Sequence, residues 1–341
     1  MLVLTEKIIT SLLQNLTQED AVSYQQTLLA ALAEYEKYPE IIPPRIVTTT
    51  PHCTHLFMAS TGSHVGMKAI TGSREGFKGI TTILDKHNGY PLGIINCATL
   101  TAFRTALCNS LSLVKFFPLD KEYSNDKLII FGVGDQAIWH ARLALILYPK
   151  RFSRVLFVNR TVTKAERLCD EVFAKDYPTI KFEARGMTTE EEKGKLVQEF
   201  KDTSVVFTCI PTSVPTVKKE YVDQCEGRCF IGAIGSYKPH MTEIDGGVLK
   251  ESVIAQGGKI VVDSVDHCLH EAGELIINNI QREDLVDVST LYSDPSSSNF
   301  FSEGKVAVSK LVGLCIMDVW VGSRCLDEAK KQGVGIEIDN F

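Results

Sequence analysis

An apolar run that ends in closely spaced glycines constrains the fold of this chain more than any other feature. Residues 127–134 read KLIIFGVG, and the pattern G-x-G-x-x-A places Gly132, Gly134 and Ala137 at its fixed positions. Such a continuous apolar run is typical of a strand buried on both faces of a parallel sheet. The first glycine permits a tight turn, the second lets phosphates approach the backbone, and the small third residue lets a helix pack on the strand.

Glycines also end strands for purely structural reasons, so the surrounding segments decide what this loop does. Residues 137–147 have helical spacing, and residues 154–160 (RVLFVNR) form a second apolar run, which gives the strand–helix–strand context that the pattern requires. A helix that starts here offers free N–H groups and a partial positive charge to phosphates. We therefore expect the loop to bind the pyrophosphate of a dinucleotide, through these four residues: Gly132, Gly134, Gln136 and Ala137.

The segments after this loop continue the alternation of strands and helices. Further buried strands are expected within residues 204–210, 228–234 and 259–265, and a helix is expected over residues 164–174. Alternation of this kind predicts a doubly wound parallel sheet. The fold class is therefore α/β, with a Rossmann domain of this type.

The first part of the chain has a different pattern. Two helices are expected before about Lys37, and residues 41–96 contain short β-rich runs broken by Gly, Pro and Ser. Asn88-Gly89 predicts a hairpin with a type I′ turn, and Thr99 is the expected N-cap of the helix that follows. This part should form a second, α+β domain.

The end of the chain and its length complete the expected organisation. A Pro/Ser-rich loop is expected at residues 294–299, followed by a long helix from about Lys305 to Lys331. A chain of 341 residues exceeds the size at which single cores usually stop growing, about 250–300 residues. We expect two domains.

Composition excludes several classes of partner. A formal net charge of −6 argues against nucleic acid or an anionic membrane as the main partner. There is no run of about 18 apolar residues, so no membrane span is expected. The ten cysteines lie mostly in apolar segments, which is typical of a reducing, cytoplasmic compartment. Cys225 and Cys229 have no second ligand pair, and His267, His270 and Glu271 lack a zinc-protease spacing, so no metal is expected.

The end of the second strand bears on cofactor choice. It reads Asn159-Arg160-Thr161, with no carboxylate where an NAD-specific domain binds the ribose 2′-hydroxyl. Arg160 can instead pair with a 2′-phosphate, assisted by Thr161 and Lys164. NADP(H) is therefore the preferred cofactor and NAD(H) remains possible, while the alternative is that Arg160 is an ordinary solvated residue.

Three cations in the first part of the chain are candidates for binding an anion. Arg104 lies one residue away from the apolar stripe of its helix, where an arginine needs an anionic partner. Lys68 lies in a short strand beside apolar neighbours, where desolvation lowers its pKa and suits it to proton transfer. Arg45 follows two prolines. From spacing alone, each of these residues can also be a solvated or structural cation.

With these residues in place, the chain resembles the ornithine cyclodeaminase/mu-crystallin family over nearly its whole length. The resemblance is carried by short segments that occur in order: Pro44-Arg45, Gly66-x-Lys68, Gly89-Tyr90-Pro91-Leu92, Leu100-Thr101-x-x-Arg104-Thr105-Ala106, Phe131-Gly132-Val133-Gly134-x-Gln136-Ala137, Val158-Asn159-Arg160-Thr161, Lys164-Ala165-Glu166, Ile234-Gly235-Ser236-Tyr237-Lys238-Pro239, Glu243-Ile244-Asp245, Val262-Asp263 and Glu271-Ala272-Gly273-Glu274.

The resemblance implies an organisation and a set of roles. It implies a homodimer, with residues 1–124 and 305–341 as the substrate-binding and dimerisation domain and residues 125–304 as the NAD(P)-binding Rossmann domain. The positions that match Arg45 and Arg104 would bind the substrate carboxylate, and Lys68 would contact substrate and cofactor near the transferred hydride. The cofactor-binding residues would be Thr105 with the glycine-loop and second-strand residues already named: Gly132, Gly134, Gln136, Ala137, Asn159, Arg160, Thr161 and Lys164. The segment Asn159–Thr161 resembles the NADP-using, mu-crystallin side of the family.

One departure from the family pattern bears on the reaction. Ornithine cyclodeaminases carry an aspartate where this chain has Ser236, and the family's acidic residue near the Lys68 strand is also missing. A diamino acid would find no counter-charge for its distal ammonium. This disfavours cyclodeaminase activity.

The leading hypothesis is an NADPH-dependent reductase in amino-acid metabolism that acts on a C=N bond beside a carboxylate, such as a cyclic ketimine. It would be an NAD(P)-dependent oxidoreductase acting on CH–NH or CH–NH₂ groups, and a related amino-acid dehydrogenase would need the same anion clamp. One alternative is an ornithine cyclodeaminase-type lyase that uses bound NAD. The other is a non-catalytic, mu-crystallin-like protein that binds NADP(H) and a small ligand.

Overall fold

The structure is a computed structural model and describes residues 1–73, 76–301 and 304–339. It divides into two compact units: unit 1 comprises Met1–Cys108 and Gly313–Phe341, and unit 2 comprises Asn109–Val312. The sequence placed the domain boundaries at 124/125 and 304/305, and the limits of the two units differ from these. The sequence-based boundaries stay a prediction.

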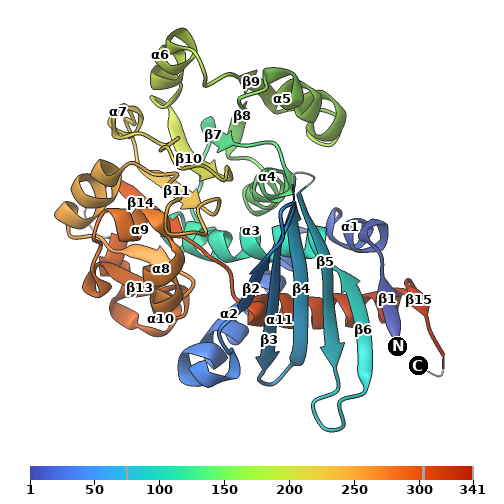
Figure 1. The fold of residues 1–341 in the computed structure, drawn as a ribbon. Helices are drawn as coiled ribbons and strands as arrows, with labels where there is room; N and C mark the ends of the chain where they lie inside the picture. Colours follow the sequence, from blue (N-terminus) through green and yellow to red (C-terminus); the bar gives the residue numbers. More distant parts are fainter. Residues whose placement is uncertain (74–75, 302–303, 340–341) are drawn as a thin grey trace. The chain divides into compact units, whose positions relative to one another are not determined.

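Unit 2 is built on an all-parallel sheet of eight strands, in the order β13-β12-β14-β11-β10-β7-β8-β9 (Figure 1). This confirms the predicted α/β class with a doubly wound sheet. The chain runs from β7 to one side of the sheet and then returns to form β10 on the other side, so the strand order reverses beside β7. The carboxyl end of strands at such a reversal is where α/β sheets bind ligands. The strands are β7 (Asp126–Phe131), β8 (Phe152–Val158), β9 (Lys181–Arg185), β10 (Thr203–Thr208), β11 (Cys229–Ala233), β12 (Ile260–Val262), β13 (Leu285–Asp287) and β14 (Val306–Lys310).

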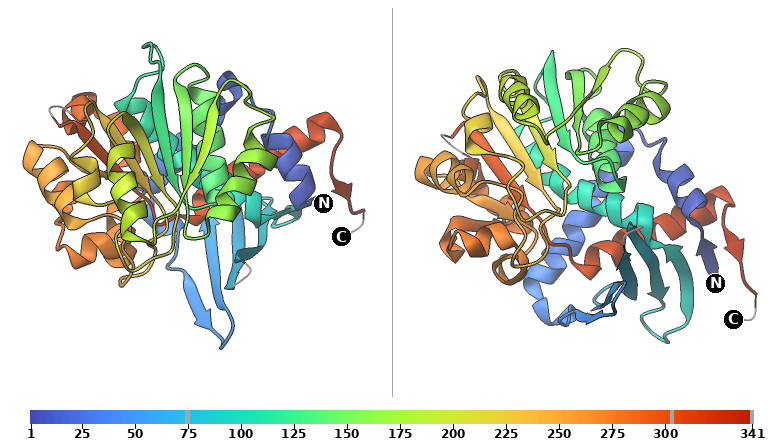
Figure 2. Two further views of the ribbon diagram at one scale, coloured as in Figure 1. Left: turned by 90° about the horizontal axis from the view of Figure 1, so that it is seen from above. Right: turned by 45° about the horizontal axis from the view of Figure 1, so that its top comes forward.

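Helices connect the strands of unit 2, and α4 follows β7 directly (Figure 2). Residues of β7, β8, β10 and β11 are buried nearly throughout, as the continuous apolar runs predicted. The helices are α4 (Asp135–Leu147), α5 (Val162–Leu168), α6 (Glu190–Glu199), α7 (Lys219–Val222), α8 (Val265–Glu271), α9 (Gly273–Ile277) and α10 (Val288–Ser293), with π-helical turns at Cys169–Phe173 and Val248–Val253 and 3₁₀ turns at Ile254–Gln256, Arg282–Asp284 and Pro295–Phe301.

Unit 1 contains a mixed sheet of seven strands, in the order β15-β1-β6-β5-β4-β3-β2. This agrees with the α+β character expected for the first part of the chain. Its strands are β1 (Leu2–Leu4), β2 (Ile46–Thr49), β3 (Thr54–Thr61), β4 (Val65–Ser73), β5 (Gly76–Leu84), β6 (Pro91–Asn96) and β15 (Ile336–Glu337). Its helices are α1 (Glu6–Leu13), α2 (Gln18–Lys37) and α11 (Cys315–Gln332), with a 3₁₀ turn at Pro39–Ile41, and α3 (Cys97–Phe116) begins in this unit.

Helix α11 packs across one face of this sheet, against β3, β4 and β5, and lies behind the strands in Figure 1. Side chains on successive strand residues point to opposite faces. Met58, Lys68 and Thr81 are directly paired across β3, β4 and β5, and all three are buried. The strand periodicity therefore directs the Lys68 ammonium to the side of the sheet that α11 covers.

The hairpin between β5 and β6 is present, but its turn is not of type I′. Of the two expected central residues only Gly89 has a positive φ, of 76°. The loop is wider: Asp85 N donates to Tyr90 O over 2.8 Å, and the Asp85 carboxylate accepts from Asn88 N over 3.2 Å. The aspartate side chain stabilises this longer turn, and the Asn-Gly pair alone did not indicate it.

Thr99 is not the N-cap of α3, so that prediction was wrong. The helix begins at Cys97, and the Asn96 side chain accepts a hydrogen bond from Ala98 N over 3.0 Å. Thr99 lies in the first turn, where its backbone N–H donates to Glu6 over 3.2 Å. Asn96, three residues before Thr99, provides the side-chain acceptor at this end of the helix.

The prediction of one long helix from about Lys305 to Lys331 was also wrong. Residues Val306–Lys310 form β14, which pairs with β11 in the parallel sheet, and the helix α11 starts only at Cys315. Gly313, with φ of 88°, separates the two elements. The apolar residues that we attributed to one helical stripe therefore belong to a buried strand and a separate helix.

Candidate functional site

In unit 1, three elements bring Lys68, Thr101, Arg104 and Asp318 together, and we call these four residues the Lys68 cluster. The Lys68 ammonium, from β4, donates to Thr101 Oγ1 over 2.7 Å and to Asp318 Oδ1 over 2.8 Å. The Arg104 guanidinium, from α3, donates through Nε to the same Asp318 oxygen over 3.3 Å. One carboxylate from α11 therefore joins the two cations that the sequence analysis singled out.

The three charged groups of the cluster are almost completely shielded from solvent. Lys68 is 2% exposed, Arg104 is 5% exposed, and Asp318 has a side-chain exposure of 0%. Buried charges are tolerated when opposite charges and hydrogen bonds compensate them. Here two positive charges face a single negative one, so the cluster has an excess of positive charge that favours a bound anion.

Arg45 reaches the same place from the segment before β2. Its Nη2 donates to the carbonyl oxygen of Gly313 over 2.7 Å. A Cβ atom added to Gly313 would lie 2.9 Å from Nη1 and Nη2 of Arg104. Both arginines therefore approach one glycine, and the absence of a side chain there leaves room for the Arg104 guanidinium.

The surroundings of Lys68 alter its acidity. Burial lowers the pKa of the Lys68 ammonium below its usual value, and Arg104 lowers this pKa further, while Asp318 opposes both effects. Removal from water disfavours the charged form of a lysine. An ammonium in this state gives up a proton more readily than one in water, as general-acid chemistry requires.

In unit 2, the glycine loop between β7 and α4 has the geometry of a phosphate cradle. Gly132 has φ of 113°, a value that favours glycine, and its N–H donates to Val158 O over 2.9 Å. Gly134 is the N-cap of α4 and provides no side-chain cap, so the N–H groups of the first helical turn remain available to a ligand. A Cβ on Gly134 would meet no atom within 4 Å. This open space beside an uncapped helix fits a pyrophosphate.

Two further residues of the loop are placed by α4. Ala137 is completely buried, as expected for the small residue that lets the helix pack on the strand. The side-chain oxygen Oε1 of Gln136 is buried and has no hydrogen-bond partner among the residues that the structure describes. Gln136 therefore has an acceptor that a ligand could use.

The candidate residues for the adenosine ribose follow the neighbouring strand. Phe131 at the end of β7 pairs with Val158 at the end of β8, so the loops after the two strands leave the sheet side by side. Asn159 Nδ2 donates to Thr161 O over 2.9 Å and fixes this second loop. The other candidate residues for the ribose are exposed to solvent: Arg160, Thr161 and Lys164. Thr105 lies in unit 1, on α3, where its hydroxyl donates to Thr101 O over 2.7 Å.

Sequence reasoning missed Asp318. The available signal was an aspartate within the otherwise apolar run Leu314–Val319, a position where an acid must have buried partners. Ser236, the residue that stands where ornithine cyclodeaminases have an aspartate, lies in a buried hydrogen-bond network. Its hydroxyl accepts from Lys310 Nζ over 2.6 Å and donates to Glu274. Burial raises the pKa of Glu243, beside this network, to about 7.

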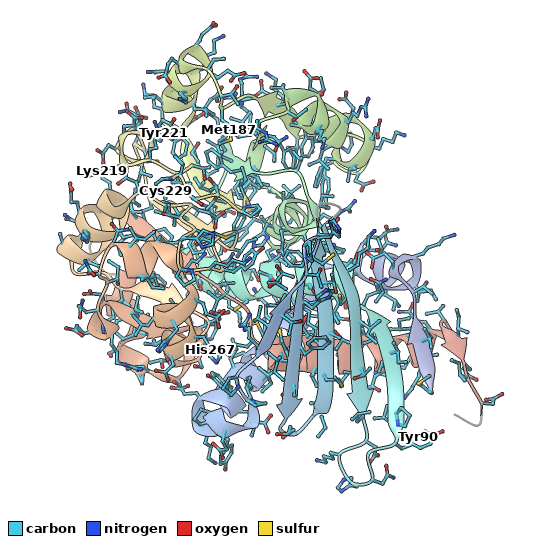
Figure 3. The ribbon with its side chains drawn as sticks, viewed as in Figure 1. Tyr90, Met187, Lys219, Tyr221, Cys229 and His267 are labelled. Atoms are coloured by element: carbon cyan, nitrogen blue, oxygen red, sulfur yellow. The ribbon has the colours of Figure 1, made fainter. Side chains whose placement is uncertain are left out.

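Other groups with possible chemistry are engaged in packing. Cys225 and Cys229 belong to the core of unit 2 with Tyr221, which Figure 3 labels beside Cys229. His267 Nδ1 lies 3.4 Å from Glu271 Oε1. In the part of the chain that the structure describes, no group of three or more His, Cys, Asp or Glu side chains could hold a metal ion. None of the described helices combines the length and apolar character that crossing a membrane requires.

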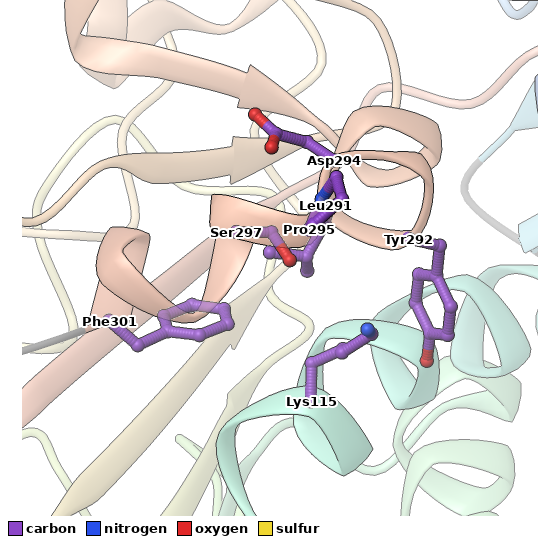
Figure 4. A pocket seen from close by; sticks show the side chains of 7 residues that line it. All are labelled: Lys115, Leu291, Tyr292, Asp294, Pro295, Ser297 and Phe301. Atoms are coloured by element: carbon purple, nitrogen blue, oxygen red, sulfur yellow. The ribbon is translucent and has the colours of Figure 1, made fainter.

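Unit 2 also has a surface pocket of about 250 Å³, shown in Figure 4. Its polar groups already contact each other or their own loop: Lys115 Nζ lies 4.4 Å from the centre of the Tyr292 ring, and the Asp294 carboxylate accepts from Ser296 N over 2.8 Å. It contains none of the candidate site residues. The pocket is lined by Lys115, Leu291, Tyr292, Asp294, Pro295, Ser297 and Phe301.

Comparison with known proteins agrees with the resemblance seen in the sequence. Residues 60–295 match the model of the ornithine cyclodeaminase/mu-crystallin family. A Delta(1)-pyrroline-2-carboxylate reductase of Bacillus cereus is 25% identical over 332 residues, which are 91% of this chain and 92% of that protein.

Solved structures share the fold over the full length of the chain. A Thermococcus litoralis Delta(1)-pyrroline-2-carboxylate reductase in complex with NADH and L-proline has a TM-score of 0.79 at 17% identity, covering 99% of this chain and 100% of that one. An archaeal alanine dehydrogenase dimer with bound NAD has a TM-score of 0.75 at 19% identity, covering 100% of this chain and 99% of that one.

Proposed function

This chain belongs to the ornithine cyclodeaminase/mu-crystallin family, and we propose that it is an NAD(P)H-dependent reductase of a C=N bond next to a carboxylate. The proposed substrates are cyclic imino acids such as Δ¹-pyrroline-2-carboxylate, the substrate in the name of a relative that matches over nine-tenths of the chain. The observation that carries the proposal is the Lys68 cluster, a buried site with excess positive charge and a lysine of lowered pKa.

The proposed reaction assigns a task to each residue of the site. Arg45 and Arg104 bind the substrate carboxylate and hold the imine in one orientation. When bound, the reduced nicotinamide supplies a hydride to the imine carbon, and the π electrons of the C=N bond move to nitrogen. Lys68 gives a proton from Nζ to that nitrogen and regains it from solvent, so the products are the cyclic amino acid and the oxidised cofactor.

The stoichiometry of nicotinamide separates this function from the two alternatives. A reductase consumes one NAD(P)H for each imine reduced. An ornithine cyclodeaminase-type lyase would release ammonia from ornithine without a net change in nicotinamide absorbance, and Ser236 disfavours it because it lies where those enzymes have an aspartate. A non-catalytic protein would bind the cofactor without turnover on any imine, 2-oxo acid or amino acid.

We propose NADP(H) as the preferred cofactor, through Arg160. The residue is exposed directly after β8, with Thr161 and Lys164 close to it in the chain, as the mu-crystallin side of the family would require. Arg160→Ala should weaken NADPH binding by about 10–100-fold, the effect of losing a charged hydrogen-bonded pair, and change NADH binding little. Fluorescence titration of both cofactors measures this, with Arg167→Ala, an exposed arginine of the following helix α5, as the control. Wild-type protein that binds NADH as tightly as NADPH would refute the preference.

We also propose that the chain forms a homodimer through the sheet face of unit 1 that lies opposite α11. Ile46, Phe57 and Ile80 occupy one face, because Ile46 pairs with Phe57 and both Phe57 and Ile80 pair with Ala69. Met67 lies two residues before Ala69 on the same face, and these four exposed side chains are between 42% and 63% accessible. Exposed apolar surface of this kind is typical of a protein interface.

A charged side chain placed on this face should weaken the dimer. Met67→Asp should raise the dimer dissociation constant by at least about 100-fold, because the unpaired charge enters a two-fold interface twice. Analytical ultracentrifugation measures the change. Val214→Asp, at an apolar residue of unit 2 that is 69% exposed, is the control and should leave the mass unaltered. A Met67→Asp protein that sediments as wild type would exclude this face.

A further inference from the structure

We propose that Asp318 is a positioning residue for this reaction: its carboxylate holds the proton donor Lys68 and the carboxylate-binding Arg104 in one fixed arrangement. The inference rests on the proposed function and extends it to a residue that lies far along the chain from both partners. Lys68 and Asp318 are 250 positions apart, and Arg104 and Asp318 are 214 positions apart.

The Lys68 ammonium has three N–H groups, and two of them are held by neighbouring side chains. One donates to Thr101 Oγ1 and one to Asp318 Oδ1. The Thr101 hydroxyl hydrogen is itself committed, because it donates to Cys97 O over 2.5 Å, so Thr101 can only accept from Lys68. An ammonium has three donors, and in the described part of the chain the third has no acceptor. Two fixed bonds set the direction of this third N–H, which is the proton that a substrate nitrogen would receive.

Asp318 also holds the Arg104 guanidinium. Asp318 Oδ1 accepts from Arg104 Nε, on the inner side of the guanidinium, while Nη1 contacts Met317 Sδ at 3.4 Å. A guanidinium held at Nε keeps its outer edge available for a carboxylate. Because the same oxygen accepts from Lys68, the position of the bound carboxylate is tied to the position of the proton donor.

The negative charge of Asp318 lies between these two cations. The carboxylate is completely buried, and its second oxygen, Oδ2, has no donor among the described residues. Its charge is therefore compensated through Oδ1 alone, by Lys68 and Arg104. Without this charge, two buried cations would face each other with no anion between them, and the arrangement would open or Lys68 would lose its proton.

The titratable groups that face Lys68 set the sign of the expected effect. They are Asp318 and Cys315 from α11, and Arg104 and Cys97 from α3. Burial and Arg104 lower the pKa of Lys68, whereas the Asp318 carboxylate raises it. Asp318→Asn removes that carboxylate charge, so the pKa of Lys68 should fall and the protonated form should disappear at a lower pH.

The experiment compares the pH dependence of kcat/KM for NADPH oxidation with Δ¹-pyrroline-2-carboxylate, using full-length wild type and Asp318→Asn. The alkaline limb should move down by about 1–3 pH units, the effect of one opposite charge at this distance, and KM should rise because the acceptor of Arg104 Nε loses its negative charge and holds the guanidinium less firmly. Asp327→Asn changes an exposed aspartate of the same helix and should leave both quantities unchanged. An Asp318→Asn profile that overlays the wild type would overturn the inference.

Two further measurements keep the inference testable if folding or activity fails. Asp318→Glu retains the charge, so it should lower kcat through misplacement while keeping the alkaline limb near that of wild type; a limb that moves as in Asp318→Asn would count against us. NMR titration of the Lys68 side chain, labelled with ¹³C at its ε carbon, needs no turnover. A wild type inactive on every imine would refute the proposed function alone, whereas an equal Lys68 pKa in wild type and Asp318→Asn would refute the role of Asp318.

Discussion

Replacing Gly134 with valine should weaken binding of both nicotinamide nucleotides by at least about 100-fold, equivalent to roughly 2.7 kcal/mol, without unfolding the protein. Gly134 has φ of −86° and ψ of −175°, an extended conformation that any residue adopts, and a Cβ there would meet no protein atom within 4 Å. The valine side chain would instead occupy the space beside the uncapped N-terminus of α4, where the pyrophosphate must approach the backbone. Binding should fail while folding persists.

Isothermal titration with NADPH and NADH, together with a thermal melt without cofactor, measures the two effects separately. Gly227→Val is the matched control, because a Cβ at Gly227 also meets no atom within 4 Å and Gly227 lies outside the loop. Its cofactor affinity should equal that of wild type. If Gly134→Val bound either nucleotide with unchanged affinity, the loop would not be the dinucleotide site.

Lys68→Ala should lower kcat by about 10²–10⁴-fold, the usual contribution of a positioned general acid. The substitution removes the ammonium whose third N–H is directed by Thr101 and Asp318. Cofactor affinity should change much less than kcat, since the pyrophosphate is assigned to the glycine loop at the start of α4 and not to Lys68. Steady-state NADPH oxidation with a cyclic imino acid gives kcat, and titration gives the cofactor affinity.

Chemical rescue distinguishes loss of the acid from structural damage. The alanine leaves space for a small primary ammonium, so added methylammonium or ethylammonium should restore part of the lost kcat in Lys68→Ala. Lys86→Ala, at an exposed lysine of the β5–β6 hairpin, should need no rescue. A Lys68→Ala enzyme with wild-type kcat would remove Lys68 from the mechanism.

Much of unit 2 could be predicted from the sequence because its signals are local. The residues before Gly132 are apolar on both faces of the strand, which is the pattern of a strand that is buried on both sides. The glycine spacing fixes the turn into α4. The end of the chain was harder, because Val308, Leu311 and Val312 fit helical spacing as well as a strand followed by a loop. Pairing with β11, a long-range contact, decided for the strand.

The candidate site could be predicted only in part, for a related reason. Lys68 and Arg104 were identified as cations with apolar neighbours, which is a local property. Their shared partner Asp318 was not, since nothing in the chain links residues so far apart until α11 packs on the sheet. A buried aspartate in an apolar helix indicates that it has a partner, but the fold decides which one.

The central claim is that a hydride passes from the nicotinamide to the carbon of a C=N bond beside a carboxylate. The most direct test supplies NADPH carrying deuterium at C4, in each of its two positions, with Δ¹-pyrroline-2-carboxylate, and analyses the product by mass spectrometry and NMR. We predict proline with deuterium at its α-carbon from one of the two labelled cofactors, in equal amount to the NADPH oxidised. Cofactor that stays reduced in the presence of cyclic imino acids, or proline that contains no deuterium from either label, would contradict this account.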